Sequence, residues 1–148
     1  MHEKKQILVA EDFEDCRLLM TLYLRQLGYA VTEAGNGEEA LERVKFNRPD
    51  LILMDISMPR MNGLEALSVL KGNPDTRDIP IVIMTAHVQR SQTNDALRAG
   101  AVDVIFKPFN LLQLGNALGR YFLPPEEGIG FAAKQVHNKE LSIGFHER

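Results

Sequence analysis

The sequence predicts an α/β protein built on one doubly wound, parallel β-sheet of five strands and five helices. Five short apolar runs alternate with five segments of helical periodicity, and this alternation is typical of a parallel sheet covered by helices. Each segment between two apolar runs is long enough for a crossover helix. The central run, residues 51–54, contains only Leu, Ile and Met, as expected of a strand buried on both faces.

The first strand is expected at residues 7–10 and the first helix at residues 13–27. The helix carries one apolar stripe with the spacing i, i+3, i+4 and i+7, made of Met20, Tyr23, Leu24 and Leu27. Leu18 and Leu22 extend the apolar surface beyond this stripe. Gly28 is a natural stop for the helix.

The second strand, residues 29–34, is separated from the second helix, residues 38–46, by the turn Gly35-Asn36-Gly37. Pro49 then breaks the chain before the central strand. The inward face of the second helix is predicted from its spacing to contain Ala40, Leu41 and Val44.

The central strand ends at Asp55 and is followed by a loop that closes with Asn62-Gly63. The third helix, residues 64–71, has an apolar face of Leu64, Leu67 and Leu70. The alternation then repeats, with strands expected at 81–84 and 102–106 and helices at 91–99 and 111–122. Gly100 ends the fourth helix and Pro124 stops the last one.

The composition is that of an ordinary globular protein of 148 residues, with 45% hydrophobic and 25% charged residues. The net charge of −3 and the lack of a dense basic stripe argue against nucleic-acid binding. Cys16 is the only cysteine, which excludes an internal disulfide and a cysteine-based metal site. No apolar run approaches the roughly 18 residues of a membrane span, and the N-terminus lacks a signal-peptide layout. We therefore expect a cytoplasmic protein with no membrane contact.

The sequence predicts one folded domain over residues 1–123 and a tail over residues 124–148. The tail is too short for a separate output domain. Its apolar residues predict that it packs partly on the domain or on a second subunit.

Polar side chains follow four of the five strands. They are the carboxylates of Glu11, Asp12 and Asp55, the hydroxyl of Thr85 and the ammonium of Lys107. The carboxyl ends of parallel strands meet at one edge of a sheet, so we expect these groups to form a cluster. Three close carboxylates repel unless a cation binds or their pKa values rise. Oxygen ligands without His or Cys favour Mg²⁺, with Mn²⁺ as an alternative, over zinc.

This set of groups is suited to phosphoryl transfer. Asp55 is the candidate nucleophile, Lys107 and a metal would neutralise the phosphoryl oxygens, and Thr85 would donate a hydrogen bond. Each residue alone has an ordinary interpretation, since an acidic pair after a strand is usually a solvated helix N-terminus. The prediction depends on all of them falling at carboxyl ends of strands.

The chain resembles a response-regulator receiver domain of two-component signalling over roughly residues 5 to 123. The segments that carry the resemblance are Ile7 to Asp12, Leu53 to Pro59, Met61-Asn62-Gly63, Ile83 to Ala86, Gly100-Ala101 and Lys107-Pro108-Phe109. The resemblance implies a flavodoxin-like sheet in the order 2-1-3-4-5. It also implies that Asp55 accepts the phosphoryl group and that Thr85 and Lys107 bind it.

For the metal, the resemblance implies that Asp12 and Asp55 are direct ligands and that Glu11 acts through a metal-bound water. The backbone carbonyl of Ser57 is implied as a further ligand. The acidic pair is Glu-Asp here, where Asp-Asp is common in the family. The family's aromatic switch residue falls at Val104, so a rotating ring is missing there, and valine is stiff about χ1.

The resemblance implies a single-domain response regulator of the chemotaxis type. Its partners would be a histidine kinase or histidine phosphotransfer protein, and a downstream target or a second copy bound through the last helices. The chain would be a phosphoacceptor that assists its own phosphorylation and dephosphorylation, and not a separate enzyme. Leu18 and Leu22 lie where the family meets its phosphodonor, with core packing as the alternative.

Two other functions remain open from the sequence. One is a pseudo-receiver that binds partners without phosphate turnover, which the missing aromatic at Val104 favours. The other is a Mg²⁺-dependent phosphatase working through an aspartyl-phosphate. Such enzymes typically carry a second Asp two residues after the nucleophile, and Ser57 occupies that position here.

Overall fold

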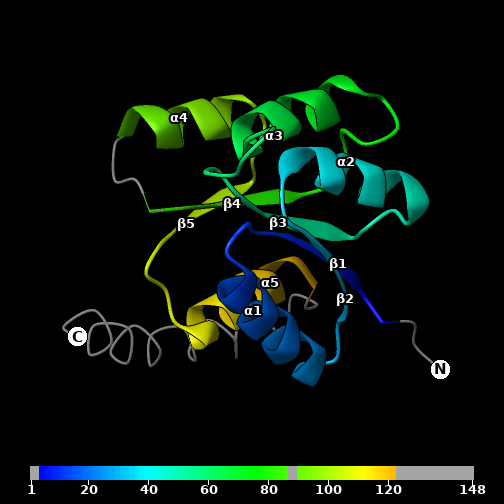
Figure 1. Cartoon of the computed structure of the whole chain (residues 1–148), viewed down its shortest axis with the longest axis vertical. Helices are drawn as coiled ribbons and strands as arrows, with labels where there is room; N and C mark the ends of the chain where they lie inside the picture. The colour runs from blue at the N-terminus through cyan, green and yellow to red at the C-terminus, as the bar shows by residue number, and fades with distance from the viewer. Residues whose placement is uncertain (1–3, 87–89, 123–148) are drawn as a thin grey trace. The chain divides into compact units, whose positions relative to one another are not determined.

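The computed structural model describes residues 4–86 and 90–122. Within these residues five strands alternate with five helices, as the sequence predicts (Figure 1). The strands are β1 (Gln6–Ala10), β2 (Ala30–Ala34), β3 (Leu51–Asp55), β4 (Ile81–Thr85) and β5 (Asp103–Phe106). The helices are α1 (Glu14–Gln26), α2 (Gly37–Phe46), α3 (Gly63–Gly72), α4 (Arg90–Arg98) and α5 (Leu111–Phe122).

The strands form one parallel sheet in the order β2-β1-β3-β4-β5, which confirms the predicted doubly wound, flavodoxin-like topology. The chain divides into two compact units, one up to Lys107 and one from Pro108. The first unit holds the whole sheet, and the second holds α5.

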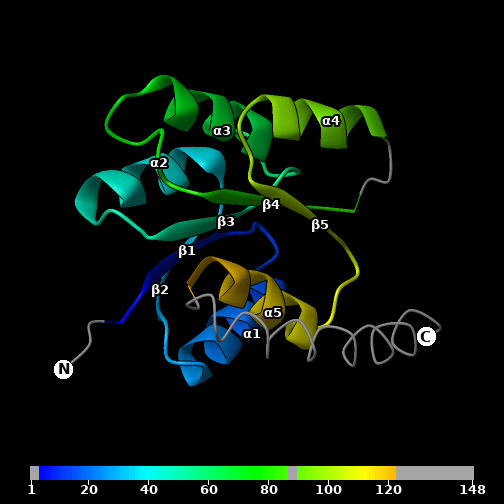
Figure 2. The same cartoon turned by 180° about the vertical axis from the view of Figure 1, so that it is seen from behind.

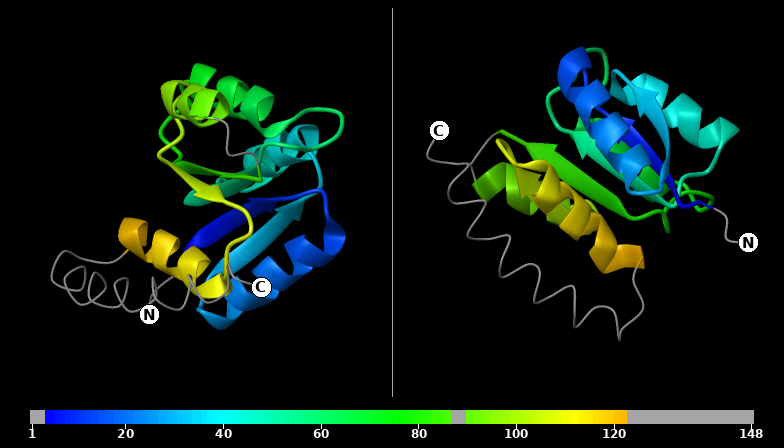
Figure 3. Two further views of the ribbon diagram at one scale, coloured as in Figure 1. Left: turned by 90° about the vertical axis from the view of Figure 1, so that its left-hand side faces the viewer. Right: turned by 90° about the horizontal axis from the view of Figure 1, so that it is seen from below.

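In the first unit, helices cover both faces of the sheet. Helix α1 lies on one face, and α2, α3 and α4 lie on the other (Figures 1 and 2). Figure 3 shows the same layers from the side and from below. Strands β3 and β4 are buried at every residue, which explains why their sequences are apolar up to the last residue.

The core beneath α2, α3 and α4 is a cluster of aliphatic side chains from the sheet and from these helices. The faces predicted for α2 and α3 are confirmed. Four of the six predicted side chains are buried in the cluster and two pack against its edge, namely Ala40, Val44, Leu67 and Leu70, and Leu41 and Leu64. Burying one such leucine contributes about 1.5–3 kcal/mol.

The structure corrects the prediction for α1. The buried side chains are Met20, Thr21 and Leu24, while Leu27 is 49% exposed. The helix ends at Gln26, and Leu27 is its C-cap. The apolar stripe predicted from the spacing therefore extended one residue past the end of the helix. Core packing of Leu18 and Leu22, the alternative stated above, is wrong, since they are 50% and 51% exposed.

Helix α5 is amphipathic. Its buried residues are Leu114, Ala117, Leu118 and Gly119, and Leu112 is 41% exposed. Asn110 precedes the helix, and its Oδ1 accepts a hydrogen bond from the backbone N–H of Gln113 at 2.8 Å. The predicted tail, residues 124–148, lies outside the described residues. None of the helices in residues 4–86 and 90–122 is long and apolar enough to cross a membrane.

Candidate functional site

Three carboxylates meet at the carboxyl edge of the sheet. Glu11 follows β1 directly, Asp12 comes next, and Asp55 is the last residue of the neighbouring strand β3. One carboxylate oxygen from each residue lies within 4.8 Å of the others. The side chains of Glu11 and Asp55 are buried, whereas Asp12 is exposed. The sequence-based expectation that strand order brings these groups together is therefore met.

Lys107 provides the positive charge in this cluster. It directly follows β5, and its Nζ donates to Asp55 Oδ2 at 3.0 Å and to Glu11 Oε1. Desolvation alone would lower the pKa of the Lys107 ammonium, but its hydrogen bonds to the two carboxylates and their charges raise it above 10.5. Lys107 is therefore a stable cation that compensates two buried negative charges.

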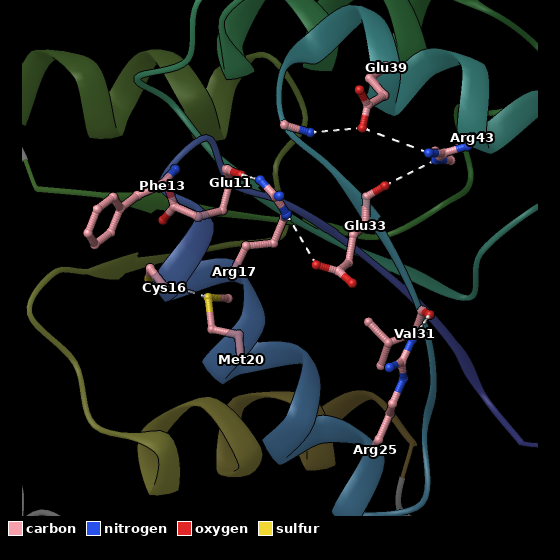
Figure 4. Close-up of polar contacts among 11 residues, drawn as sticks. Glu11, Phe13, Cys16, Arg17, Met20, Arg25, Val31, Glu33, Glu39 and Arg43 are labelled. Atoms are coloured by element: carbon pink, nitrogen blue, oxygen red, sulfur yellow. Dashed lines mark hydrogen bonds and ion pairs between the residues drawn. The ribbon is translucent and has the colours of Figure 1, made fainter.

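Backbone groups hold the two buried carboxylates in place. The N–H of Phe13 donates to Glu11 Oε2 at 3.2 Å (Figure 4), and the N–H of Ser57 donates to Asp55 Oδ1 at 3.3 Å. Hydrogen bonds of this kind restrict the rotamers of both side chains and hold one oxygen of each carboxylate in a fixed position.

Thr85 lies at the same edge of the sheet. It is the last residue of β4 and is 1% exposed, and its carbonyl accepts the backbone N–H of Lys107 at 2.7 Å. This bond ties the ends of β4 and β5 together. The role of its hydroxyl in binding a phosphoryl group remains a prediction.

Val104 lies inside β5 and pairs in register with Ile83. Its half-buried side chain packs against the edge of the aliphatic core. The sequence-based assignment of a switch position there remains a prediction.

The loop between β3 and α3 is fixed by a close backbone contact. The N–H of Gly63 donates to the carbonyl of Ile56 at 2.9 Å, and a β-carbon on Gly63 would lie 2.0 Å from the carbonyl oxygen of Asp55. Asn62 and Glu65 form a capping box at the start of α3. Only glycine fits at position 63, and this tight turn places the loop beside Asp55.

The donor set fits a hard divalent cation. Three carboxylates within 4.8 Å offer oxygen ligands only, which is the chemistry that Mg²⁺ prefers. Glu11, Asp12 and Asp55 would hold the ion. The carbonyl of Ser57 remains a predicted ligand.

Cys16 takes no part in this chemistry. Its Sγ lies 3.9 Å from the sulfur of Met20 on the next turn of α1. Burial, followed by the negative charge of Glu11, raises the pKa of the thiol to about 11. Cys16 therefore stays protonated at neutral pH and is a poor nucleophile and metal ligand.

Replacing Asp12 with asparagine is expected to stabilise the metal-free protein slightly near neutral pH. Desolvation raises the pKa of Asp12 above 3.8. The hydrogen bond between Asp12 and Glu11 and the negative charge of Glu11 raise it further. A carboxyl group whose pKa is raised in the folded state lowers the stability of the protein at pH values above that pKa. At pH values well below the pKa of the unfolded state it has no effect on stability. Because the side chain is exposed, the gain is at most about 0.5 kcal/mol. It should disappear as the pH falls towards 3.8.

Thermal unfolding in the presence of EDTA measures this effect. Addition of Mg²⁺ should reverse the order, because only the wild type retains all three carboxylates and is stabilised by about 2.7 kcal/mol at 100 times the dissociation constant. A variant that is less stable than the wild type in EDTA would contradict the prediction.

The contacts of Arg17 at this site were not predicted. Its Nη1 donates to the carbonyl of Glu11 at 2.8 Å, and its Nε pairs with Glu33 at 3.1 Å (Figure 4). The one feature of the sequence that could have indicated these contacts is a basic residue about one helical turn after the acidic pair. Its partner on β2 is 16 residues away along the chain and cannot be found from local spacing.

Comparison with known proteins identifies the family. The model of the response regulator receiver domain matches residues 7–119. The chain is 36% identical over 118 residues to the chemotaxis protein CheY of Thermotoga maritima, which covers 78% of this chain and 96% of CheY. It is 39% identical over 115 residues to the transcriptional regulatory protein PdtaR of Mycobacterium tuberculosis, covering 77% of this chain and 55% of PdtaR. The chain thus spans about half the length of that relative.

Solved structures agree with this result. The chemotaxis response regulator CheY4 of Vibrio cholerae superposes with a TM-score of 0.76 at 28% identity and covers 81% of this chain and 100% of CheY4. The receiver domain of the sensor histidine kinase PA1611 from Pseudomonas aeruginosa, which has a magnesium ion coordinated in its active-site cleft, gives a TM-score of 0.74 at 31% identity. It covers 80% of this chain and 98% of that domain. Because the family model spans most of its length, the chain belongs to the response regulator receiver family.

Proposed function

We propose that this receiver domain accepts a phosphoryl group on Asp55 in a Mg²⁺-dependent reaction and signals through protein contact. The observation that carries the proposal is the position of Asp55. It lies at the carboxyl end of the central strand, with Lys107 Nζ at 3.0 Å and the carboxylates of Glu11 and Asp12 within 4.8 Å. A nucleophile, a cation and a metal-binding set therefore share one site.

The phosphodonor would be the phosphohistidine of a histidine kinase or phosphotransfer protein. A carboxylate oxygen of Asp55 forms a bond to phosphorus while the bond from phosphorus to the histidine nitrogen breaks, and that nitrogen keeps the electron pair. Lys107 moves its hydrogen bonds from the carboxylates to the phosphoryl oxygens, and the hydroxyl of Thr85 donates to another of them. Glu11, Asp12, Asp55 and the carbonyl of Ser57 would hold Mg²⁺, which supplies further positive charge when bound.

Exposed apolar side chains on α1 and at its N-cap, Phe13, support a protein phosphodonor. Phe13, Leu18, Leu19 and Leu22 are each at least half exposed, and α1 begins three residues after Glu11. An apolar surface of this kind beside a reactive group is typical of a protein-docking site. We propose that the donor binds there, and we place the protein in the cytoplasm with its donor.

The phosphorylated protein would signal by binding another protein. Leu97 on α4 and Leu112 on α5 are 46% and 41% exposed, and we propose that a downstream target or a second copy binds these last helices. A phosphoryl group adds nearly two negative charges at Asp55, which shifts the balance between preexisting conformations.

The phosphatase alternative has less support. Ser57 stands where such an enzyme would place its second carboxylic acid, and its backbone N–H is bonded to Asp55. The pseudo-receiver alternative has to account for the intact contact of Asp55 with Lys107.

Incubation with Mg²⁺ and acetyl phosphate is expected to give one acid-stable, base-labile phosphoryl adduct, detected by intact mass and mapped to Asp55. Asp55→Asn should give none, because an amide is not a nucleophile here. The matched control is Asp50→Asn, the same change just before β3, where the carboxylate accepts the N–H of Gln6. Asp50→Asn should be phosphorylated normally.

No adduct on the wild type would favour a pseudo-receiver. An undiminished adduct on Asp55→Asn would move the acceptor elsewhere. Steady release of phosphate from an unrelated phosphoester would instead favour a phosphatase.

A further inference from the structure

A chain of hydrogen bonds and ion pairs leads from the acidic pair to the edge strand of the sheet (Figure 4). Arg17 on α1 stands at its centre, with its side chain 20% exposed. Its Nη1 donates to the backbone carbonyl of Glu11 at 2.8 Å, and its Nε donates to Glu33 Oε1 on β2 at 3.1 Å. The two contacts use different nitrogens of one rigid guanidinium group.

The contact with Glu11 acts on the metal-binding residues through the backbone. The carbonyl of Glu11 belongs to the same planar peptide unit as the N–H of Asp12. On its other side, the N–H of Glu11 donates to the carbonyl of Ala34 at 3.0 Å. Arg17 therefore completes a two-sided hold on Glu11 and sets the direction in which Asp12 leaves the strand.

The partner of Arg17 is itself held firmly. The carbonyl of Glu33 accepts a hydrogen bond from Arg43 Nε at 3.1 Å. Arg43 also pairs with Glu39 at 3.9 Å, and Glu39 Oε1 accepts the N–H of Gly35 at 3.1 Å. These bonds tie the end of β2 to α2. Arg17 is thus paired with a residue whose backbone is tied to α2, which limits how far the acceptor can move.

We propose that Arg17 is a positioning residue for the divalent metal, acting through the carbonyl of Glu11 on the carboxylates of Glu11 and Asp12. The inference rests on the proposed function, because it concerns the same metal-binding set. Within the described part of the chain, Arg17 bonds the backbone carbonyl of Glu11 and the carboxylate of Glu33, and no carboxylate of the metal-binding set. Its effect on the metal is indirect, through the peptide that carries two of the ligands.

A positioning role and a simple charge effect predict opposite results. If Arg17 acted only through its charge, removing this cation near three carboxylates would strengthen the binding of a divalent metal. If Arg17 orients the peptide, its removal weakens binding, because the carboxylates no longer start from the binding geometry. Loss of such a supporting contact typically weakens metal binding by about 10- to 100-fold.

The test compares Arg17→Met with Arg25→Met. Both changes keep an aliphatic stem and remove a guanidinium from α1. Arg25 Nη2 donates to the carbonyl of Val31 on β2 at 3.2 Å, so the control also loses a bond from α1 to β2. Mn²⁺ binding is measured by electron paramagnetic resonance of the free ion, and thermal unfolding in EDTA reports stability separately.

Arg17→Met is expected to bind Mn²⁺ about tenfold more weakly than the wild type, with Arg25→Met within twofold. The Mg²⁺ concentration that half-saturates phosphorylation by acetyl phosphate should rise by the same factor. Equal loss in both variants, or binding by Arg17→Met within twofold of the wild type or tighter, would overturn the inference.

Arg17→Lys keeps the test decisive if Arg17→Met does not fold. Lysine retains the charge and the stem, but one ammonium replaces the two nitrogens that bond Glu11 and Glu33 at once. We expect at least about threefold weaker Mn²⁺ binding, and unchanged binding would overturn the inference. A wild type that binds no Mn²⁺ would overturn the proposed function together with this inference. Wild-type binding that Arg17→Met and Arg17→Lys both retain would overturn only the inference.

Discussion

Replacing Gly63 with alanine is expected to destabilise the protein by about 3 kcal/mol or more and to suppress phosphorylation of Asp55. A β-carbon at this position would lie 2.0 Å from the carbonyl oxygen of Asp55 and 2.8 Å from its carbonyl carbon. Both neighbours are backbone atoms at the end of a fully buried strand, so no side chain can move aside. The start of α3 has to shift away from β3, which breaks the bond from Gly63 to Ile56.

Gly72→Ala is the matched control for this change. Gly72 is the last residue of the same helix, and a β-carbon there would meet nothing within 4 Å. Alanine at this position should be neutral or stabilise by up to about 1 kcal/mol, because it restricts the unfolded chain. Urea unfolding measures both variants, and the rate of reaction with acetyl phosphate measures the site. Equal stability of the two variants would contradict the steric argument.

The fold could be predicted because its determinants are local. The run Leu51 to Met54 and the run Ile81 to Met84 are apolar at every position, and this pattern specifies strands buried on both faces. Parallel pairing then follows from the helical segments between them. The failure at Leu27 has the same origin, since periodicity gives the face of a helix but not the residue at which the helix ends.

The site could be predicted only in part. The side chains that converge each lie at the carboxyl end of a strand, and the strand order determines which of them are neighbours. They are Glu11, Asp55 and Lys107. The sequence does not reveal that Lys107 bonds Glu11 as well as Asp55, or that Arg17 bonds the Glu11 carbonyl. These contacts depend on side-chain rotamers and on partners far along the chain. The spacing of residues in the sequence gives information about neither.

Replacing Lys107 with methionine is expected to destabilise the metal-free protein strongly. The ammonium is the hydrogen-bonding cation of the buried carboxylates of Glu11 and Asp55, which are 1% and 7% exposed at their side chains. Breaking a buried ion pair by removing one partner costs about 3–5 kcal/mol. Because Lys107 is itself 23% exposed, we expect the lower end of that range, about 3 kcal/mol near neutral pH in EDTA.

The matched control for this change is Lys71→Met. The Nζ of Lys71 donates to the carbonyls of Arg77 and Ile79 at 2.9 and 2.8 Å. Removing it therefore takes a hydrogen-bond donor from two neutral carbonyl groups, whereas removing Lys107 takes a cation from two carboxylates. Each lost hydrogen bond costs about 1 kcal/mol. Mg²⁺ should therefore stabilise Lys107→Met more than it stabilises Lys71→Met, because the metal replaces only the charge of Lys107.

The pH dependence gives an independent check on Lys107. A lysine whose pKa is raised above 10.5 in the folded state contributes its full stabilisation below the unfolded value and loses it as the pH rises through the folded value. The stability difference between the wild type and Lys107→Met should thus be constant from neutral pH up to about pH 10 and then shrink. Phosphorylation of the variant by acetyl phosphate should fall about 100-fold or more, since a cation at the phosphoryl oxygens is lost. A variant that is as stable as the wild type in EDTA would show that the two carboxylates do not depend on this ammonium.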